Sequence, residues 1–407
     1  MHYPDCSHDK ARPRYDRPNL MAISSADSRR RLDQVPETIN PPPAEPPLSS
    51  YWPALDGLRG LAILLVFGFH LPFGPFRSGS YGVILFFVLS GFLITTILLR
   101  ELDKNKAVDL RRFYGRRARR LFPSLVVVVV AHLILQLTIL GEPEEWWGRS
   151  WPVLAYVSNY VQIAGTQLLH MSHTWSLAIE EHFYLLWPVT LLIIPRRWRF
   201  RVTIALVVAF VAWRFQYLVT GATHDRIYFA TDTNAFAPLL GCALAIAIHE
   251  NRIPKPTRNV STLSTVALVL VACIPWHYYD RRLLYLTLPV AGLAAVAIYG
   301  ALFRPAEWLQ NPVLRWFGKI SYGLYLWHYM MISLPWEQLV PVPPFVPMIA
   351  APIVLAGLSW RFIEAPFLGR RPAGESTAAV QETSALGAEE NGSDSFVGTR
   401  EVFSRRR

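Results

Sequence analysis

An arginine and a histidine stand within one apolar stretch near the start of the chain. The motif Leu55-Asp56-Gly57-Leu58-Arg59-Gly60 leads into an apolar run that ends at His70. Ionisable side chains inside a membrane helix are costly, and they mark a functional site by default. Eleven helical steps of about 100° come within about 20° of three turns, so both side chains share a face, roughly 16 Å apart along the axis. The alternative is a snorkelling arginine and a histidine that only packs.

His70 is the candidate general base, because an ordinary histidine pKa of about 6.5 suits proton transfer from a hydroxyl near neutral pH. The hydroxyl oxygen would then attack an electrophilic carbonyl, with Arg59 or a nearby donor stabilising the oxyanion. Glu180 or Glu181 would orient the imidazole, as carboxylates do in catalytic triads. A covalent acyl-histidine or an acyl-serine at Ser90 is the alternative. Direct transfer is preferred, since no Gly-x-Ser-x-Gly motif supports a serine nucleophile.

A basic segment offers a place for the phosphates of an anionic ligand. Arginine gives planar, always-charged, bidentate donors for phosphate. Arg117 and Arg120 are three residues apart and face the same way if the third helix begins early. Arg116 is a further candidate for the same role. The alternative is that these charges only hold the loop on the cytoplasmic side. The whole basic set comprises Arg112, Arg116, Arg117, Arg119 and Arg120.

The elements that position these residues must be membrane helices. Hydrophobic residues make up 52% of the 407, charged residues only 17%, and the mean hydropathy is +0.25. This composition excludes an ordinary soluble domain and a disordered chain. We therefore predict an all-α polytopic membrane bundle of about ten transmembrane helices. The expected spans are 55–73, 82–100, 121–140, 176–195, 202–219, 234–249, 262–278, 283–303, 319–336 and 346–363.

The distribution of basic residues predicts the orientation. The segment from Arg100 to Arg120 holds nine Lys or Arg residues against three Asp or Glu residues, and later basic clusters fall on the same side. By the positive-inside rule both termini are cytoplasmic, in a plasma or inner membrane. The apolar stretch 151–166 is short and broken, so it predicts a re-entrant or interfacial piece or an eleventh span.

The two ends of the chain differ from the middle. Residues 1–50 contain nine prolines and are predicted to be a disordered cytoplasmic tail. Residues 368–407 are predicted to be a disordered C-terminal tail, and residues 51–367 the membrane domain. Because the chain ends in a short polar tail, we expect no further domain.

The three cysteines are too few and scattered for a disulfide framework or a zinc site, so no metal is expected. The net charge of +11 fits cytoplasmic loops and does not indicate nucleic acid.

Six blocks in order resemble acyltransferase family 3, a family of polytopic bacterial membrane proteins. Each block is weak alone, but together they span about residues 51–367. They are the Asp-Gly-Leu-Arg-Gly motif with His70, Phe86-Phe87-Val88-Leu89-Ser90-Gly91, the basic segment 113–123, Thr174-Trp175-Ser176-Leu177 with Glu180-Glu181, Ser321-Tyr322-Gly323-Leu324-Tyr325-Leu326-Trp327-His328 and Arg361-Phe362-Ile363-Glu364.

The resemblance implies an O-acyltransferase that moves an acyl group, often acetyl, from acyl-CoA to a hydroxyl of a sugar, glycolipid, envelope component or metabolite. Acyl-coenzyme A (acyl-CoA) is then a co-substrate whose phosphates Arg116, Arg117 and Arg120 would bind, and no bound cofactor is expected. Carried over by position, the family's residues are Arg59, His70, Arg117 and Arg120, with Glu180 and Glu181 as weaker candidates. The chain departs from the family at Ile84, Asn234, Phe236 and Ala365, which bears on the acceptor.

Two other hypotheses remain beside the enzyme. One is a proton-coupled transporter of an acyl or glycosyl compound with His70 and Glu180 as a proton relay. The other is a scaffold subunit of an envelope-synthesis complex. Release of free CoA thiol distinguishes the enzyme from both. His328 stands in an aromatic stretch and is expected to be a packed or interfacial residue. The sequence does not identify the acyl chain, the acceptor, protein partners or the oligomeric state.

Overall fold

The computed structural model describes residues 51–141, 143–257, 259–276 and 279–368. The tails predicted to be disordered lie outside these residues, apart from the last helical position at 368. The described residues form helices and no strands. Their order is α1 (Pro53–His70), α2 (Tyr81–Asn105), α3 (Leu110–Leu135), η1 (Gln136–Leu140), α4 (Pro143–Leu154), α5 (Ser158–Ile163), η2 (Leu169–Thr174), α6 (Trp175–Ile193), η3 (Arg196–Trp198), α7 (Arg199–Val219), α8 (His224–Phe229), α9 (Thr231–Asn234), α10 (Phe236–His249), α11 (Val260–Ala272), α12 (Arg281–Phe303), η4 (Glu307–Gln310), α13 (Pro312–Ile332), α14 (Trp336–Leu339), α15 (Phe345–Ser359), η5 (Trp360–Glu364) and α16 (Ala365–Leu368).

Each predicted span corresponds to a helix, and the all-α membrane bundle is confirmed. Seven helical segments of the described chain are long and apolar enough to cross a bilayer. They contain α1, α2, α3 with η1, α7, α10, α12 and α15. The other three predicted spans are α6, α11 and α13. Of these, α11 has only 13 residues, whereas α6 and α13 carry the polar residues that make up much of the candidate site.

Burial separates inner helices from outer ones. In the most apolar 18 residues of each candidate span, about two thirds or more are buried for α1 (67%), α2 (78%) and α10 (67%). Only 17% are buried for α7 and for α15. The exposed faces are apolar, which suits contact with lipid rather than water. Arg59 and His70 on α1 and Ser90 on α2 therefore lie on inner helices, where their partly buried side chains need polar partners.

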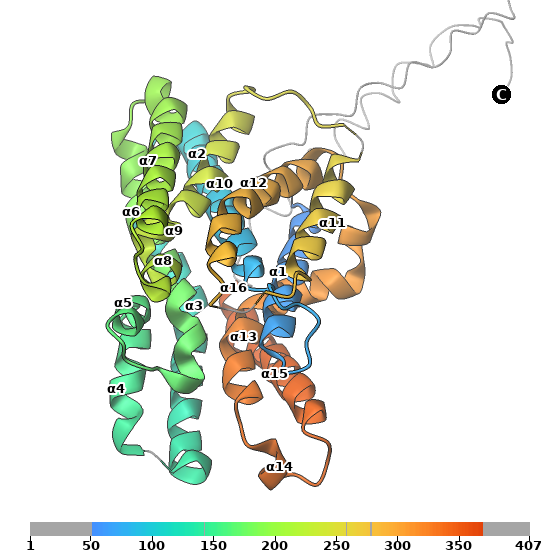
Figure 1. Ribbon diagram of the computed structural model, residues 1–407. Coiled ribbons are helices and arrows are strands. Elements are labelled where there is room, and N and C mark those ends of the chain that lie inside the picture. The colour runs from blue at the N-terminus through green and yellow to red at the C-terminus, as the bar shows by residue number, and fades with distance from the viewer. Residues whose placement is uncertain (1–50, 142, 258, 277–278, 369–407) are drawn as a thin grey trace, which may run out of the picture. The chain divides into compact units, whose positions relative to one another are not determined.

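Glycine allows α1 and α13 to pack closely (Figure 1). A Cβ atom on Gly60 would stand 2.0 Å from the carbonyl oxygen of Leu314, and one on Gly318 would stand 1.9 Å from that of Asp56. Small residues let membrane helices approach in this way. The two helices run parallel, since Gly60 meets Leu314 near the start of α13 whereas His70, at the end of α1, meets a residue near its end. The glycines of the Asp-Gly-Leu-Arg-Gly block thus have a packing function.

The early start of the third helix is confirmed, and the stretch 151–166 is broken. The third helix begins early, at Leu110, where the Asp109 side chain accepts a hydrogen bond of 2.9 Å from the backbone N–H of Arg112. Arg117 and Arg120 therefore lie one turn apart on α3. In the stretch 151–166, α4 and α5 are separated by a turn in which Tyr156 has φ of 55°. The re-entrant or interfacial piece and the eleventh span stay predictions.

Candidate active site

Three histidines gather where the end of α1 meets α13 and η2. The Nε2 atom of His328 lies 3.2 Å from Nδ1 of His70, and the ring centroids are 4.9 Å apart. The ring of His173, from η2, lies 5.1 Å from that of His328. We call His70, His173 and His328 the histidine cluster. Both His173 and His328 are buried, with 4% and 0% exposure, and His70 is half-buried.

Aromatic and hydroxyl groups enclose the histidine cluster. The Tyr329 ring meets His70 edge-on at 5.0 Å and stacks on His173 at 5.4 Å. The hydroxyl of Tyr325 donates to the backbone carbonyl of His173 and lies 2.7 Å from Oγ of Ser176. Burial, together with the nearby His70, lowers the pKa of His173 to about 3, so this ring is neutral near pH 7.

A second polar network lies nearer the starts of α1 and α13 and extends to α2 and α6. Arg59 donates from Nη2 to Oγ of Ser321 at 3.0 Å. On α2 and α6, Oγ of Ser90 donates to Glu180 Oε1 at 3.0 Å and lies 2.7 Å from the hydroxyl of Tyr184. That hydroxyl donates to the second oxygen of Glu180 at 3.0 Å. Each hydroxyl and the carboxylate thus has a partner, as buried polar groups require.

Two arginines of α3 complete this network. The guanidinium of Arg117 lies over the Tyr184 ring, 3.4 Å from its centroid. Arg120 lies within the electrostatic field of Arg59 and Arg117, and the Glu364 carboxylate partly offsets these positive charges. The buried Nε atoms of both α3 arginines have no hydrogen-bond partner among the described residues. Buried donors without partners are costly, so they are available for an anionic ligand. We call Arg59, Arg117 and Arg120 the arginine cluster.

The remaining predicted acyl-CoA-binding residue lies apart from the arginine cluster. Arg116 is exposed, and its guanidinium forms a 3.7 Å ion pair with Glu101. One helical step of about 100° turns it away from Arg117. Glu181 is partly buried near Arg117, and its Oε1 has no hydrogen-bond partner in the described chain.

The structure corrects how the predicted catalytic residues are grouped. Glu180 forms hydrogen bonds with Ser90 and Tyr184. The side-chain partner of Nδ1 of His70 is the imidazole of His328. The expectation that a glutamate orients His70 is therefore wrong. Arg59 and His70 both face α13, as their spacing predicted. They stay roughly 16 Å apart along α1, however, which removes Arg59 from a common oxyanion site with His70. Ser90 likewise belongs to the network of Glu180.

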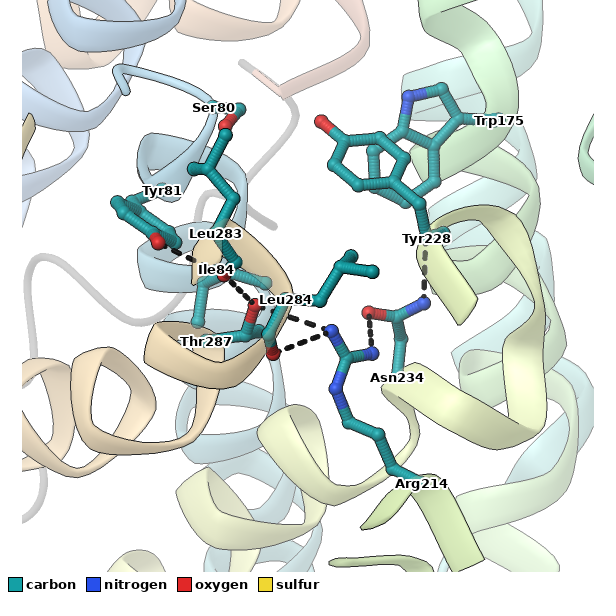
Figure 2. A pocket seen from close by; sticks show the side chains of 10 residues that line it. All are labelled: Ser80, Tyr81, Ile84, Trp175, Arg214, Tyr228, Asn234, Leu283, Leu284 and Thr287. Carbon is teal, nitrogen blue, oxygen red and sulfur yellow. Dashed lines mark hydrogen bonds between the residues drawn. The ribbon is translucent and has the colours of Figure 1, made fainter. Parts of the chain in front are cut away.

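Sequence reasoning underrated His328 and missed Arg214. His328 is packed, as expected, but it also contacts the proposed base. Arg214 lies on α7 with 1% exposure, a cation that the apolar run 202–219 already displayed. Figure 2 shows its guanidinium pointing toward Asn234 and Thr287. It also donates to the backbone carbonyls of Ile227, Thr233 and Leu284.

Through these hydrogen bonds, Arg214 on α7 connects α7 to α8, α9 and α12. A cavity beside it is lined by Ser80, Tyr81, Trp175, Tyr228 and other residues shown in Figure 2. The cavity holds about 20 Å³, which is room for about one water molecule and not for a substrate. The function of Arg214 in this arrangement is therefore structural. In the described part of the chain, no group of three or more His, Cys, Asp or Glu residues is placed to hold a metal ion.

The chain is similar to known proteins over most of its length. The family model described as "Acyltransferase domain" matches residues 52–361. "Peptidoglycan O-acetyltransferase OatA" of Listeria monocytogenes is 35% identical over 353 residues, covering 78% of this chain and 56% of the relative. "Putative peptidoglycan O-acetyltransferase YrhL" of Bacillus subtilis is 34% identical, covering 78% of this chain and 55% of the relative. The chain thus spans about half the length of the relatives it matches. No solved structure matches it.

Proposed function

Because this chain belongs to the acyltransferase family that its residues 52–361 match, we propose that it is a membrane O-acyltransferase acting on a component of the cell envelope. The names of the relatives support acetyl as the acyl group and a peptidoglycan-type sugar hydroxyl as the acceptor. Because these relatives are much longer than the matched region, the substrates of this chain are part of the proposal.

One observation carries the proposal: the separation of the two clusters along α1. The arginine cluster provides unpaired buried donors near the start of the helix, and His70 provides a base at its end. This arrangement suits an acyl-group donor whose phosphates lie far from its reactive carbonyl. Acyl-CoA has this form, with its phosphates at the arginine cluster and its thioester near His70.

The reaction then proceeds by direct transfer. Nε2 of His70 takes the proton of the acceptor hydroxyl while the oxygen attacks the thioester carbonyl. The tetrahedral intermediate collapses, the C–S bond breaks, and the departing thiolate takes the proton from His70. The products are the acyl ester and free CoA. A base at the far end of α1 fits an acceptor that approaches from outside.

The orientation is proposed with the function. Both termini would be cytoplasmic, which places the arginine cluster on the side where acyl-CoA is made. Support comes from the nine basic residues of the segment 100–120, which joins the end of α2 to the start of α3. Labelling single cysteines introduced at 107 and 149 with a membrane-impermeant reagent tests this orientation. Labelling of intact cells at 149 alone is expected, and labelling at 107 alone would reverse the assignment.

The test of function is CoA thiol release from acetyl-, propionyl- and longer acyl-CoAs by the purified protein in lipid with a cell-envelope extract. Acceptor-dependent release is expected in the wild type and in Arg282→Ala, whose exposed guanidinium pairs with its neighbour Asp280. Loss is expected in His70→Ala and Arg117→Ala. Absence of release together with absence of acyl-CoA binding would overturn the enzyme and favour a transporter.

A further inference from the structure

We propose that His328 is a positioning residue for His70: it fixes the ring nitrogen on which His70 carries its proton and shares the positive charge that forms during transfer. This inference rests on the acyl transfer proposed above. It assigns to an imidazole the part that a carboxylate plays in a catalytic triad.

The protonation of His328 follows from its backbone partners. Its Nδ1 atom lies 2.7 Å from the carbonyl oxygen of Tyr325 and 3.1 Å from that of Leu324. Carbonyl oxygens only accept hydrogen bonds, so Nδ1 must carry the hydrogen. In the neutral ring, Nε2 of His328 then holds a lone pair. His328 is wholly buried, which keeps water from competing for that lone pair.

The same argument extends to His70. Its Nδ1 atom lies 2.9 Å from the carbonyl oxygen of Val66 and 3.2 Å from Nε2 of His328. Both neighbours are acceptors, so Nδ1 of His70 must be the donor to them. The lone pair of the neutral ring is then on Nε2. The two contacts together select one tautomer of His70, and it is the tautomer that leaves Nε2 able to take a proton.

His328 is the group placed to stabilise the positive charge that forms on His70 during transfer. Within the described residues, no hydrogen bond or ion pair joins a carboxylate to either ring. The other titratable groups facing the pair are His173, Tyr325 and Tyr329. When Nε2 of His70 accepts the hydroxyl proton, the Nδ1–H bond to His328 becomes charge-assisted and therefore stronger. When the thiolate takes that proton back, both rings return to their starting state.

Solid-state NMR on ¹⁵N-histidine-labelled protein in lipid at pH 8 tests the tautomers without turnover. Spectra of His70→Ala and His328→Gln assign the two rings. The expected result is a hydrogen on Nδ1 and none on Nε2 in both rings, with magnetisation transfer from Nδ1–H of His70 to Nε2 of His328. A hydrogen on Nε2 of either neutral ring overturns the proposal, whatever the activity.

Turnover tests the catalytic part. In His328→Phe, which keeps the volume but lacks the acceptor, we expect kcat to fall about 10- to 100-fold with little change in KM. His328→Gln offers an amide oxygen near the position of Nε2 and is expected to recover much of kcat. Arg282→Ala, whose exposed guanidinium lies outside both clusters and pairs with Asp280, is the control expected to keep the wild-type kcat, and CoA binding checks that each variant is folded.

The two proposals fail in different ways. A folded His328→Phe protein with wild-type kcat overturns the positioning role while acyl transfer stands. If the wild-type protein shows the expected tautomers but neither binds any acyl-CoA nor releases thiol from it, the acyl transfer is overturned, and the catalytic role of His328 with it.

Discussion

The guanidinium carbon of Arg117 lies 3.4 Å from the centroid of the Tyr184 ring. This contact joins the basic segment of α3 to the buried hydroxyl and carboxylate groups of α2 and α6, because the Tyr184 hydroxyl bonds to Glu180 and lies beside Ser90. An arginine held over an aromatic face has its guanidinium oriented before any ligand arrives. The basic segment therefore contains two kinds of arginine, those built into the bundle and those on its surface.

Arg117→Ala is expected to weaken CoA binding by about tenfold or more, because it removes a charged donor from a buried site. Arg116→Ala is expected to change binding by less than about twofold, because its guanidinium is exposed and pairs with Glu101. Titration calorimetry on protein in lipid nanodiscs measures both. Equal losses in the two variants would mean that overall charge, and not the arginine cluster, binds the phosphates.

Ser90→Ala distinguishes a structural hydroxyl from a covalent relay. Ser90 bonds to Glu180 and Tyr184 and has no contact with His70 in the described structure. We therefore expect acyl transfer to persist in Ser90→Ala, with a stability loss of about 1 kcal/mol from the lost hydrogen bonds. Abolished transfer in a folded variant, together with an acylated Ser90 peptide in the wild type by mass spectrometry, would establish the relay instead.

Gly60→Ala should separate α1 from α13. The added Cβ would stand 2.0 Å from the Leu314 carbonyl oxygen, and overpacking of this kind costs about 1–3 kcal/mol. Gly292→Ala is the matched control, since nothing lies within 4 Å of its Cβ position. Thermal unfolding in detergent is expected to show a lower midpoint for Gly60→Ala and an unchanged or higher one for Gly292→Ala. Equal midpoints would show that the helices can move apart at little cost.

Arg214→Met is expected to destabilise the protein without altering CoA binding by the folded fraction. The substitution removes the charge-assisted hydrogen bonds that the guanidinium donates to buried acceptors, among them Oδ1 of Asn234 and the carbonyl of Leu284, at a cost of about 3 kcal/mol. The exposed substitution Arg282→Met should leave the unfolding midpoint unchanged. Loss of CoA binding in folded Arg214→Met protein would give this residue a role in the site.

The pH dependence of stability should include a contribution from His173, in the short helix η2 outside the seven candidate spans. Burial lowers its pKa in the folded state to about 3, whereas the unfolded chain protonates near pH 6.5. The unfolded state therefore binds more protons below that pH, and stability falls as the pH drops from about 6.5 toward 3. The unfolding midpoint of His173→Phe should fall less between pH 8 and pH 5 than that of the wild type. An identical fall in both proteins would mean that His173 is not neutral in the fold.

Much of the architecture could be predicted from the sequence because it depends on local patterns. The apolar runs gave the helices, and the spacing of Arg59 and His70 gave the face that they share. Asp109 ahead of the basic segment fits the early start of α3, which places Arg117 and Arg120 on one side. Boundaries shifted by a few residues because helix ends depend on capping and packing as well as on hydropathy.

The partners of the site residues could not be predicted in the same way. Glu180 was assigned to His70 on chemical type, since a carboxylate is the usual partner of a catalytic histidine. In the fold, Glu180 faces α2 and bonds to Ser90 instead. His328 was underrated because a histidine in an aromatic stretch usually packs. Its contact with a ring 258 positions earlier in the chain has no local signature.

The sequence by itself determined that this protein is a helical membrane protein of the acyltransferase family, and it identified Arg59, His70, Arg117 and Arg120 as the residues to examine. Helix formation, span length and motif order are properties of neighbouring residues. Only the tertiary structure decided that the arginines and the histidines form two clusters at different levels of α1, and that His328 is the partner of His70. Those facts depend on which helices pack side by side, and here glycine contacts between α1 and α13 determine that packing.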